Sequence, residues 1–168
     1  MGYAHYFAYA PQDLRLHAIW QRLRQDAGAI VRFVEEVRLI ELAGGDGCGR
    51  PQTSGDTIAL NGPLAHGEDY DELSISLAPP AEGPSVRWSY GFCRTGPLCP
   101  LPYDEAATAV LLRAHQLAPR HFAIDSDGDW RRDWAGARTI CAVLFDPWDT
   151  ACPFTADLRR NGPRCCRS

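Results

Sequence analysis

The stretch that decides the fold class is ELSISLAPPAEGPSVRWSYGFCRT, residues 72–95. Apolar and polar side chains alternate over residues 72–79 and again over residues 85–95. A period of two predicts two β-strands. The loop between them is rich in proline and glycine, so the two strands follow one another without a helix. Strands that cluster in this way between helical segments are typical of an α+β protein.

The remaining elements fall on both sides of this stretch. Apolar residues recur at helical spacing over residues 12–36, 104–117 and 129–145, and these predict three helices. Short apolar or aromatic runs predict strands at residues 3–9, 56–62 and 121–124. The order predicts an α+β fold with a mixed or mostly antiparallel sheet of about five strands and about three helices packed on it.

The chain has 168 residues, which is the usual size of one domain. The apolar pattern stops after Phe145, and the segment that follows is rich in arginine, proline and glycine. We therefore expect a single α+β domain at residues 1–146 and a loosely ordered C-terminal tail at residues 147–168.

Composition excludes several classes of function. The net charge is −4 and the sequence pI is about 5.7, which argues against a general nucleic-acid binder with a basic face. The chain contains no lysine, so neither Schiff-base chemistry nor a phosphate-binding P-loop lysine is available. Seven cysteines occur without a CxxC pair, which gives a structural zinc site little support.

Targeting signals are also missing from the sequence. The N-terminus MGYAHYFAYA has neither a basic segment nor a long apolar run, and no window holds the roughly 18 uninterrupted apolar residues of a membrane span. We expect a cytoplasmic protein without membrane contact.

The acidic segment FAIDSDGDW, residues 122–130, follows the last predicted strand. A calcium-binding EF-hand loop needs glycine at its sixth position and glutamate at its twelfth, and neither is present when counting starts at Asp125. Asp129 is placed to cap the following helix. Asp127 is then free for another role, because one cap needs one residue. The sequence predicts no metal site and identifies no cofactor.

Other polar candidates stand at predicted strand ends and helix starts, where ligand sites tend to form. Arg94 ends a strand and suits a phosphate or carboxylate, while Tyr103 and Asp104 open a helix. His66 and Glu68 form the H-x-E pair of zinc deaminases, but the P-C-x-x-C partner motif is missing. Each has a structural alternative: Asp104 as a helix cap, and His66 and Glu68 in a solvated loop.

Five short motifs occur in an order that resembles a group of small proteins of phages, prophages and bacterial genomes. They are G-Y-x-H-Y-aromatic at residues 2–7, LAGGDGxGxP at 42–51, LNG followed by H-x-E at 60–68, FC[KR]T and PYD at 92–104, and SDGD at 126–129. Members of the group often open with G-Y-T-H-Y-W and usually have lysine where this chain has Arg94. The resemblance brings no activity with it.

The resemblance does imply positions of interest, and these define two hypotheses. The first is a pocket for a small anionic, nucleotide-like ligand, with or without acid–base chemistry. Its catalytic candidates are His5, Asp104 and Asp127, and its ligand-binding candidates are Asn61, His66, Glu68, Arg94, Tyr103 and Ser126. The alternative is a non-enzymatic interaction protein, for example a phage counter-defence protein that binds a host protein through exposed aromatic residues. Convergence of the candidates in one concave site would favour the pocket.

Overall fold

Helices and strands follow one another along the chain in the order that the sequence predicts. The computed structural model describes residues 3–81, 87–97, 99–146, 151–155 and 158. Within these residues it contains β1 (Tyr3–Tyr9), α1 (Leu14–Val37), β2 (Thr57–Leu60), a short 3-10 turn η1 (Leu64–His66), β3 (Leu73–Ser76), β4 (Ser89–Gly96), α2 (Asp104–Leu117), β5 (Phe122–Ser126) and α3 (Ala135–Phe145). The predicted α+β class, with about five strands and three helices, is confirmed.

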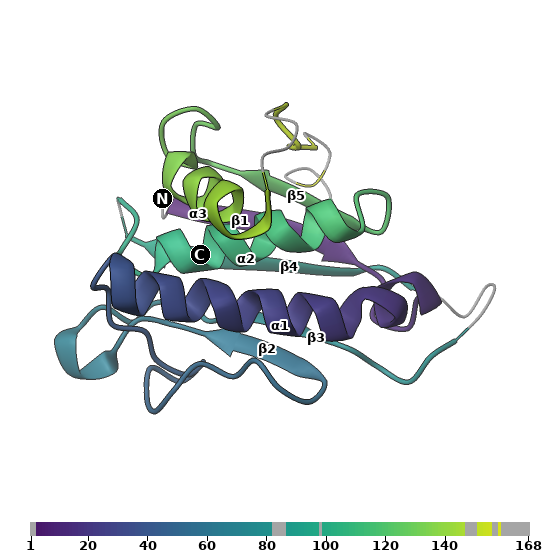
Figure 1. Ribbon diagram of the computed structural model, residues 1–168, viewed down its shortest axis with the longest axis horizontal. Helices are drawn as coiled ribbons and strands as arrows, with labels where there is room; N and C mark the ends of the chain where they lie inside the picture. Colours follow the sequence, from purple (N-terminus) through teal and green to yellow (C-terminus); the bar gives the residue numbers. More distant parts are fainter. Residues whose placement is uncertain (1–2, 82–86, 98, 147–150, 156–157, 159–168) are drawn as a thin grey trace, which may run out of the picture.

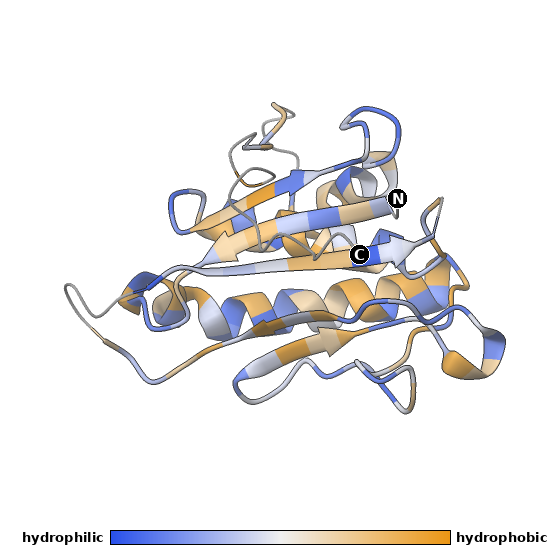
Figure 2. Ribbon diagram, turned by 180° about the vertical axis from the view of Figure 1, so that it is seen from behind, coloured by the Kyte–Doolittle hydropathy of each residue, from blue (hydrophilic) through white to orange (hydrophobic). Residues whose placement is uncertain are grey.

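The strands divide between two antiparallel sheets. The larger sheet has the order β4-β1-β5, and β2 pairs with β3 in the smaller one. The three helices lie in front of the strands in Figure 1, and Figure 2 shows the strands from behind. Alternate residues of β1 point toward the helices, and three of its four residues on that side, His5, Phe7 and Tyr9, are buried.

The two sheets meet along a seam between β3 and β4 that side chains bridge. At one end, the backbone N–H of Asp71 donates to the carbonyl oxygen of Arg94 at 3.0 Å, and the Tyr103 hydroxyl lies 2.9 and 3.1 Å from the carbonyl oxygens of these two residues. At the other end, the Tyr9 hydroxyl bonds to the backbone of Ser76. The predicted five strands therefore form one layer that is split in the middle.

Helix α1 begins at Leu14 because the Asp13 side chain accepts a hydrogen bond from the N–H of Arg15 at 2.8 Å. Its buried stripe runs from Leu16 to Val34 and belongs to the same core as the apolar residues of β2 and β3. Buried Asp26 joins α1 to α2 through an ion pair with Arg113 at 2.8 Å. The observed helix matches the predicted range of 12–36 within two residues.

Helix α2 spans Asp104–Leu117, as predicted, and most of its side chains are buried between α1 and α3. Helix α3 differs from the prediction, because it starts at Ala135 and not at residue 129. Residues 130–134 form turns that Asp129 caps, accepting bonds from the N–H groups of Arg131 and Arg132 at 3.0 and 2.8 Å. The apolar spacing of Trp130 and Trp134 therefore reflects the packing of both side chains in the core, and it does not indicate a helix at these residues.

The segment beyond α3 lies partly outside the described residues, at 147–150, 156–157 and 159–168. Phe154 forms a parallel bridge with Ile124 of β5, and its ring lies 5.6 and 5.1 Å from the rings of Trp130 and Trp134. Leu158 is buried. The predicted domain boundary at 146 therefore falls between α3 and residues that pack on the same core. In the described part of the chain, no helix has the length and apolar character to span a membrane.

Candidate functional site

Three of the sequence candidates meet where β1, β5 and α2 come together. The imidazole of His5 lies 2.9 Å from the Ser126 hydroxyl through Nδ1 and 2.6 Å from Asp104 Oδ1 through Nε2. Antiparallel pairing sets Ser126 directly opposite His5, and Asp104 is the first residue of α2. The exposed fractions of His5 and Ser126 are 0% and that of Asp104 is 5%. We call this set the His5 network.

The bonds around Ser126 assign the protons in the His5 network. The Ser126 hydroxyl oxygen accepts from the backbone N–H of Gly128 at 2.9 Å and from the indole N–H of Trp134 at 3.1 Å. These two bonds use both lone pairs of the oxygen, so its own hydrogen goes to His5 Nδ1. The proton of the neutral ring is then on Nε2, where it donates to Asp104. This order of donors is that of a Ser-His-Asp relay.

Thr95 is a member of the His5 network that the sequence analysis missed. Its hydroxyl donates to Asp104 Oδ1 at 2.5 Å and lies 3.4 Å from His5 Nε2. Thr95 is completely buried, and the register of β4 with β1 skips it, which marks a bulge at this residue. The sequence contains no signal for this bulge, so Thr95 could not be identified from the FCRT motif. The carboxylate of Asp104 also benefits from the positive end of α2.

Aromatic rings close the His5 network on two sides. The rings of Tyr3 and Trp134 meet the His5 ring edge-on, at centroid distances of 5.2 and 5.3 Å. Burial raises the pKa of the Tyr3 hydroxyl well above its usual value, and the negative charge of Asp104 adds to this. The Ser126 side chain acts on the pKa of this hydroxyl in the opposite direction. The network is thus shut off from solvent by apolar walls.

Asp127 and Arg94 stay outside the His5 network. Asp127 is exposed, and its carboxylate accepts from the N–H of Ala4 at 3.2 Å, which extends the pairing of β1 and β5. Arg94 forms an ion pair with Asp71, with 2.9 Å between Nε and Oδ2, and lies over the rings of Tyr70 and Phe92. Neither residue points into the cluster that holds His5.

The other four candidates have separate positions. The Asn61 side chain bonds to the backbone of Gly45, Gly62 and Tyr70 and so joins two loops. Tyr103 bridges the seam between the sheets. The remaining two are on a surface loop after β2: His66 is exposed and lies 3.6 Å from a glutamate, and Glu68 is half-buried. The nine candidates therefore do not share one concave site.

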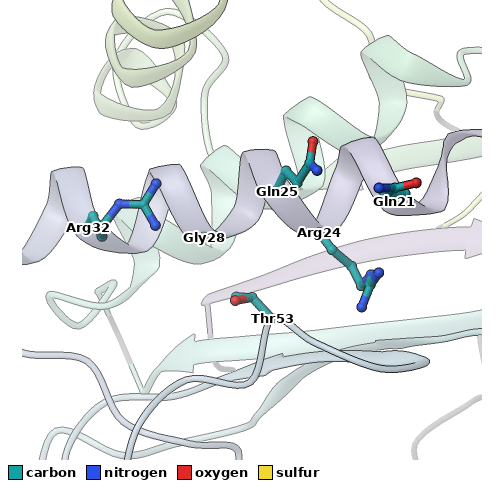
Figure 3. A pocket seen from close by; sticks show the side chains of 6 residues that line it. All are labelled: Gln21, Arg24, Gln25, Gly28, Arg32 and Thr53. Atoms are coloured by element: carbon teal, nitrogen blue, oxygen red, sulfur yellow. The ribbon is translucent and has the colours of Figure 1, made fainter.

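A hollow on α1 contains none of the predicted candidates. It has a volume of about 340 Å³, and its wall is polar (Figure 3). Five of its lining residues follow one face of α1 and the sixth comes from the loop before β2: Gln21, Arg24, Gln25, Gly28, Arg32 and Thr53. We call it the arginine hollow. The sequence hides it, because a polar stripe on an amphipathic helix looks like an ordinary solvated face.

The two arginines of this hollow have no carboxylate partner in the described part of the protein. Neither Arg24 nor Arg32 forms an ion pair with a described residue, which is true of several other arginines as well, whereas Arg22, Arg38, Arg94, Arg113 and Arg132 each form one. The Nε atom of Arg24 is buried and has no hydrogen-bond partner in the described part of the chain. Buried donors are normally satisfied, so this N–H group is an exception among the described residues.

Comparisons with known proteins leave the geometry as the basis for function. No protein-family model, no curated protein and no solved structure matches the chain. Among the residues with described positions, no group of three or more histidine, cysteine, aspartate or glutamate side chains is arranged to hold a metal ion.

Proposed function

We propose that this protein binds a small anionic, nucleotide-like molecule in the arginine hollow. The observation that carries the proposal is the presence of two guanidinium groups, those of Arg24 and Arg32, that face one hollow without a carboxylate partner among the described residues. A volume of about 340 Å³ lies within the range of small-molecule sites.

The chemistry of the lining supports an anion. A guanidinium group presents its N–H donors in a planar fork that matches the oxygen atoms of phosphate and carboxylate. The buried, unpartnered N–H of Arg24 carries a desolvation cost of about 1–3 kcal/mol, which rotation of the side chain toward a ligand oxygen would remove. Gln21 and Gln25 add amide groups that both donate and accept, as the edge of a nucleobase requires.

The proposed binding does not include acid–base chemistry at the His5 network. A general base must lie within hydrogen-bond reach of the proton that it removes. Both ring nitrogens of His5 already bond to Ser126 and Asp104, and the His5 side chain is completely buried. None of these residues lines the arginine hollow. The proposal is therefore one of binding, and it assigns no reaction.

A second candidate function is that of an interaction protein. Trp88 and Tyr90 are each 46% exposed, and Tyr70, whose ring lies under the half-buried Arg94, is 39% exposed. Tryptophan, tyrosine and arginine are the residues that most often dominate binding between proteins. The resemblance to phage and prophage proteins favours a host protein as the partner, in a counter-defence role.

The test of the ligand proposal is a titration of the protein with nucleoside monophosphates, followed by calorimetry and by the melting temperature. We expect binding by the wild-type protein and its loss in the double variant Arg24→Gln/Arg32→Gln. Arg15→Gln is the matched control, because Arg15 is exposed on α1 outside the hollow. Absence of heat and of any melting shift with every anionic nucleotide would overturn the proposal.

A further inference from the structure

We infer that Gly28 is an atom-sized seat for one oxygen of a phosphoryl group, so that the ligand of the arginine hollow is a phosphomonoester. This inference rests on the proposed function and adds the ligand's chemical class. Gly28 lies in the middle of α1, where glycine is among the least favourable residues. Its presence there needs a reason.

The backbone does not require glycine at this position. Gly28 lies within α1 and is absent from the glycines with positive φ, which are Gly47, Gly49, Gly55 and Gly67. Any residue that forms helices can adopt the conformation of Gly28. Conformational freedom therefore gives no reason for glycine here.

Packing does not require it either. A Cβ atom at Gly28 would lie 3.4 Å from Thr53 Oγ1 and 3.8 Å from Arg32 Nη1, which are ordinary van der Waals distances. Gly136 in α3 shows the contrasting case, since a Cβ atom there would lie 2.5 Å from Glu105 Oε1. Alanine would fit at position 28 and would favour the helix.

What the missing side chain provides is an empty point between two donors. The position that a Cβ atom would fill is flanked by the hydroxyl of Thr53 and the guanidinium of Arg32. A ligand oxygen cannot occupy this point itself, which lies one covalent bond from Cα, but without a side chain it can rest against the Gly28 Cα farther out, on the side of the Thr53 hydroxyl and the Arg32 guanidinium. In Figure 3, Arg32 and Arg24 lie on either side of Gly28 along the helix, and Thr53 faces it from the loop.

The arrangement of these donors favours a phosphoryl group over a carboxylate. A carboxylate is planar and pairs best with a single guanidinium fork in its own plane. Here the donors come from two elements, with Thr53 on the loop and Arg24 and Arg32 on successive parts of α1. A tetrahedral group offers separate oxygen atoms in different directions, and its two negative charges match the two arginines.

The test compares Gly28→Ala with the wild-type protein, with adenosine 5′-monophosphate, adenosine 5′-carboxylic acid and adenosine as probes. We expect Gly28→Ala to raise the melting temperature of the free protein by about 2–4 °C, as a better helix former should. The same variant should weaken monophosphate binding at least about tenfold, which corresponds to ~1.4 kcal/mol. Thr53→Val should weaken it as well, without filling the seat.

Ala29→Gly is the matched control, because Ala29 is the next residue of α1 and does not line the hollow. It should lower the melting temperature and leave the dissociation constant unchanged, so that stability and binding separate. Equal affinity for the monophosphate and the carboxylic acid would overturn the phosphoryl seat while the anionic-ligand proposal stands. Unchanged monophosphate binding by Gly28→Ala would do the same. If no anionic probe binds to the wild-type protein, both proposals fail.

Discussion

The hydroxyl group of Tyr9 bonds to both backbone polar groups of Ser76. It donates to the carbonyl oxygen at 3.2 Å and accepts from the N–H at 3.0 Å. Tyr9 ends β1 and Ser76 ends β3, so a side chain here takes the place of a neighbouring strand's backbone. Burial raises the pKa of the Tyr9 hydroxyl and outweighs the opposite effect of the bond to Ser76, so the group keeps its proton at neutral pH.

Replacing Tyr9 by phenylalanine should destabilise the fold. The change leaves the N–H and the carbonyl of Ser76 without their partner, and we expect a loss of about 1–3 kcal/mol in the free energy of unfolding. Urea denaturation measures this. Tyr90→Phe is the control, because Tyr90 is an exposed tyrosine of β4, and its effect should stay within about 0.5 kcal/mol. Equal urea midpoints for the two variants would contradict the bridging role of Tyr9.

Ser126→Ala should lower the free energy of unfolding more than Thr95→Val. Loss of the Ser126 hydroxyl leaves three buried groups unpartnered, on His5, Gly128 and Trp134. Loss of the Thr95 hydroxyl removes one donor from Asp104, and we expect that to cost about 1 kcal/mol, with a clearly larger loss for Ser126→Ala.

The same network predicts the tautomer of His5. Nitrogen-15 NMR of the imidazole should show the proton on Nε2 and none on Nδ1, because the Ser126 hydroxyl donates to Nδ1. A proton on Nδ1 in the native protein would show that the donor order around Ser126 is wrong.

Asp129 and Asp127 should differ in their contributions to stability. Asp129 caps the turn before α3 with two bonds to backbone N–H groups, so Asp129→Ala should cost about 1 kcal/mol. Asp127 is exposed and accepts two longer bonds, from the N–H of Ala4 at 3.2 Å and from the Tyr6 hydroxyl at 3.5 Å, so Asp127→Ala should cost less. Thermal melts of both variants decide the order, and a greater loss for Asp127→Ala would reverse the assignment.

The Asp133 carboxylate should make stability depend on pH in the acid range. Hydrogen bonds and charge from Arg132 lower the pKa of Asp133 below its ordinary value of 3.8, against the opposing effect of burial. The unfolded chain therefore binds this proton more readily than the native protein. The stabilisation is complete above pH 3.8 and is lost as the pH falls through the lower, native pKa.

The variant Asp133→Asn lacks this titration. The difference in unfolding free energy between wild type and Asp133→Asn should be constant from neutral pH down to about pH 5 and should shrink below pH 3.8. Chemical denaturation at a series of pH values measures it. A difference that stays the same at the most acidic pH would rule out the Asp133–Arg132 pair as its source.

The element order was predictable because each element has a local pattern. Helix α2 has the predicted bounds, since its apolar residues repeat at helical spacing and a proline-rich loop precedes it. The start of α3 was missed because Trp130 and Trp134 also have helical spacing, and only the bonds to Asp129 show the turn. The split between the sheets was not predictable, because tyrosine hydroxyls make the bridges and strand alternation does not reveal them.

The candidate sites divide in a similar way. Asp104 was identified as a polar residue that opens a helix, and His5 and Ser126 as positions that the resemblance implies. Strand pairing brings His5 and Ser126 together. The arginine hollow was missed because its concavity arises when a distant loop, carrying Thr53, folds against one face of α1. No local pattern in α1 distinguishes that face from a solvated one.

The side-chain seam also has a consequence for slow motions of the molecule. Opening the seam would break the tyrosine bridges and the single backbone bond between Asp71 and Arg94, but it would leave the backbone ladder of β4, β1 and β5 intact. The amide protons of β2 and β3 should therefore exchange with solvent through a smaller opening than those of β1. The loop that carries Thr53 is tied to β2 by the paired bonds between Gln52 and Ala59. A molecule bound between Thr53 and α1 would hold β2 and β3 in place. It would therefore slow deuterium uptake in β2 and β3, including at residues that the bound molecule does not contact.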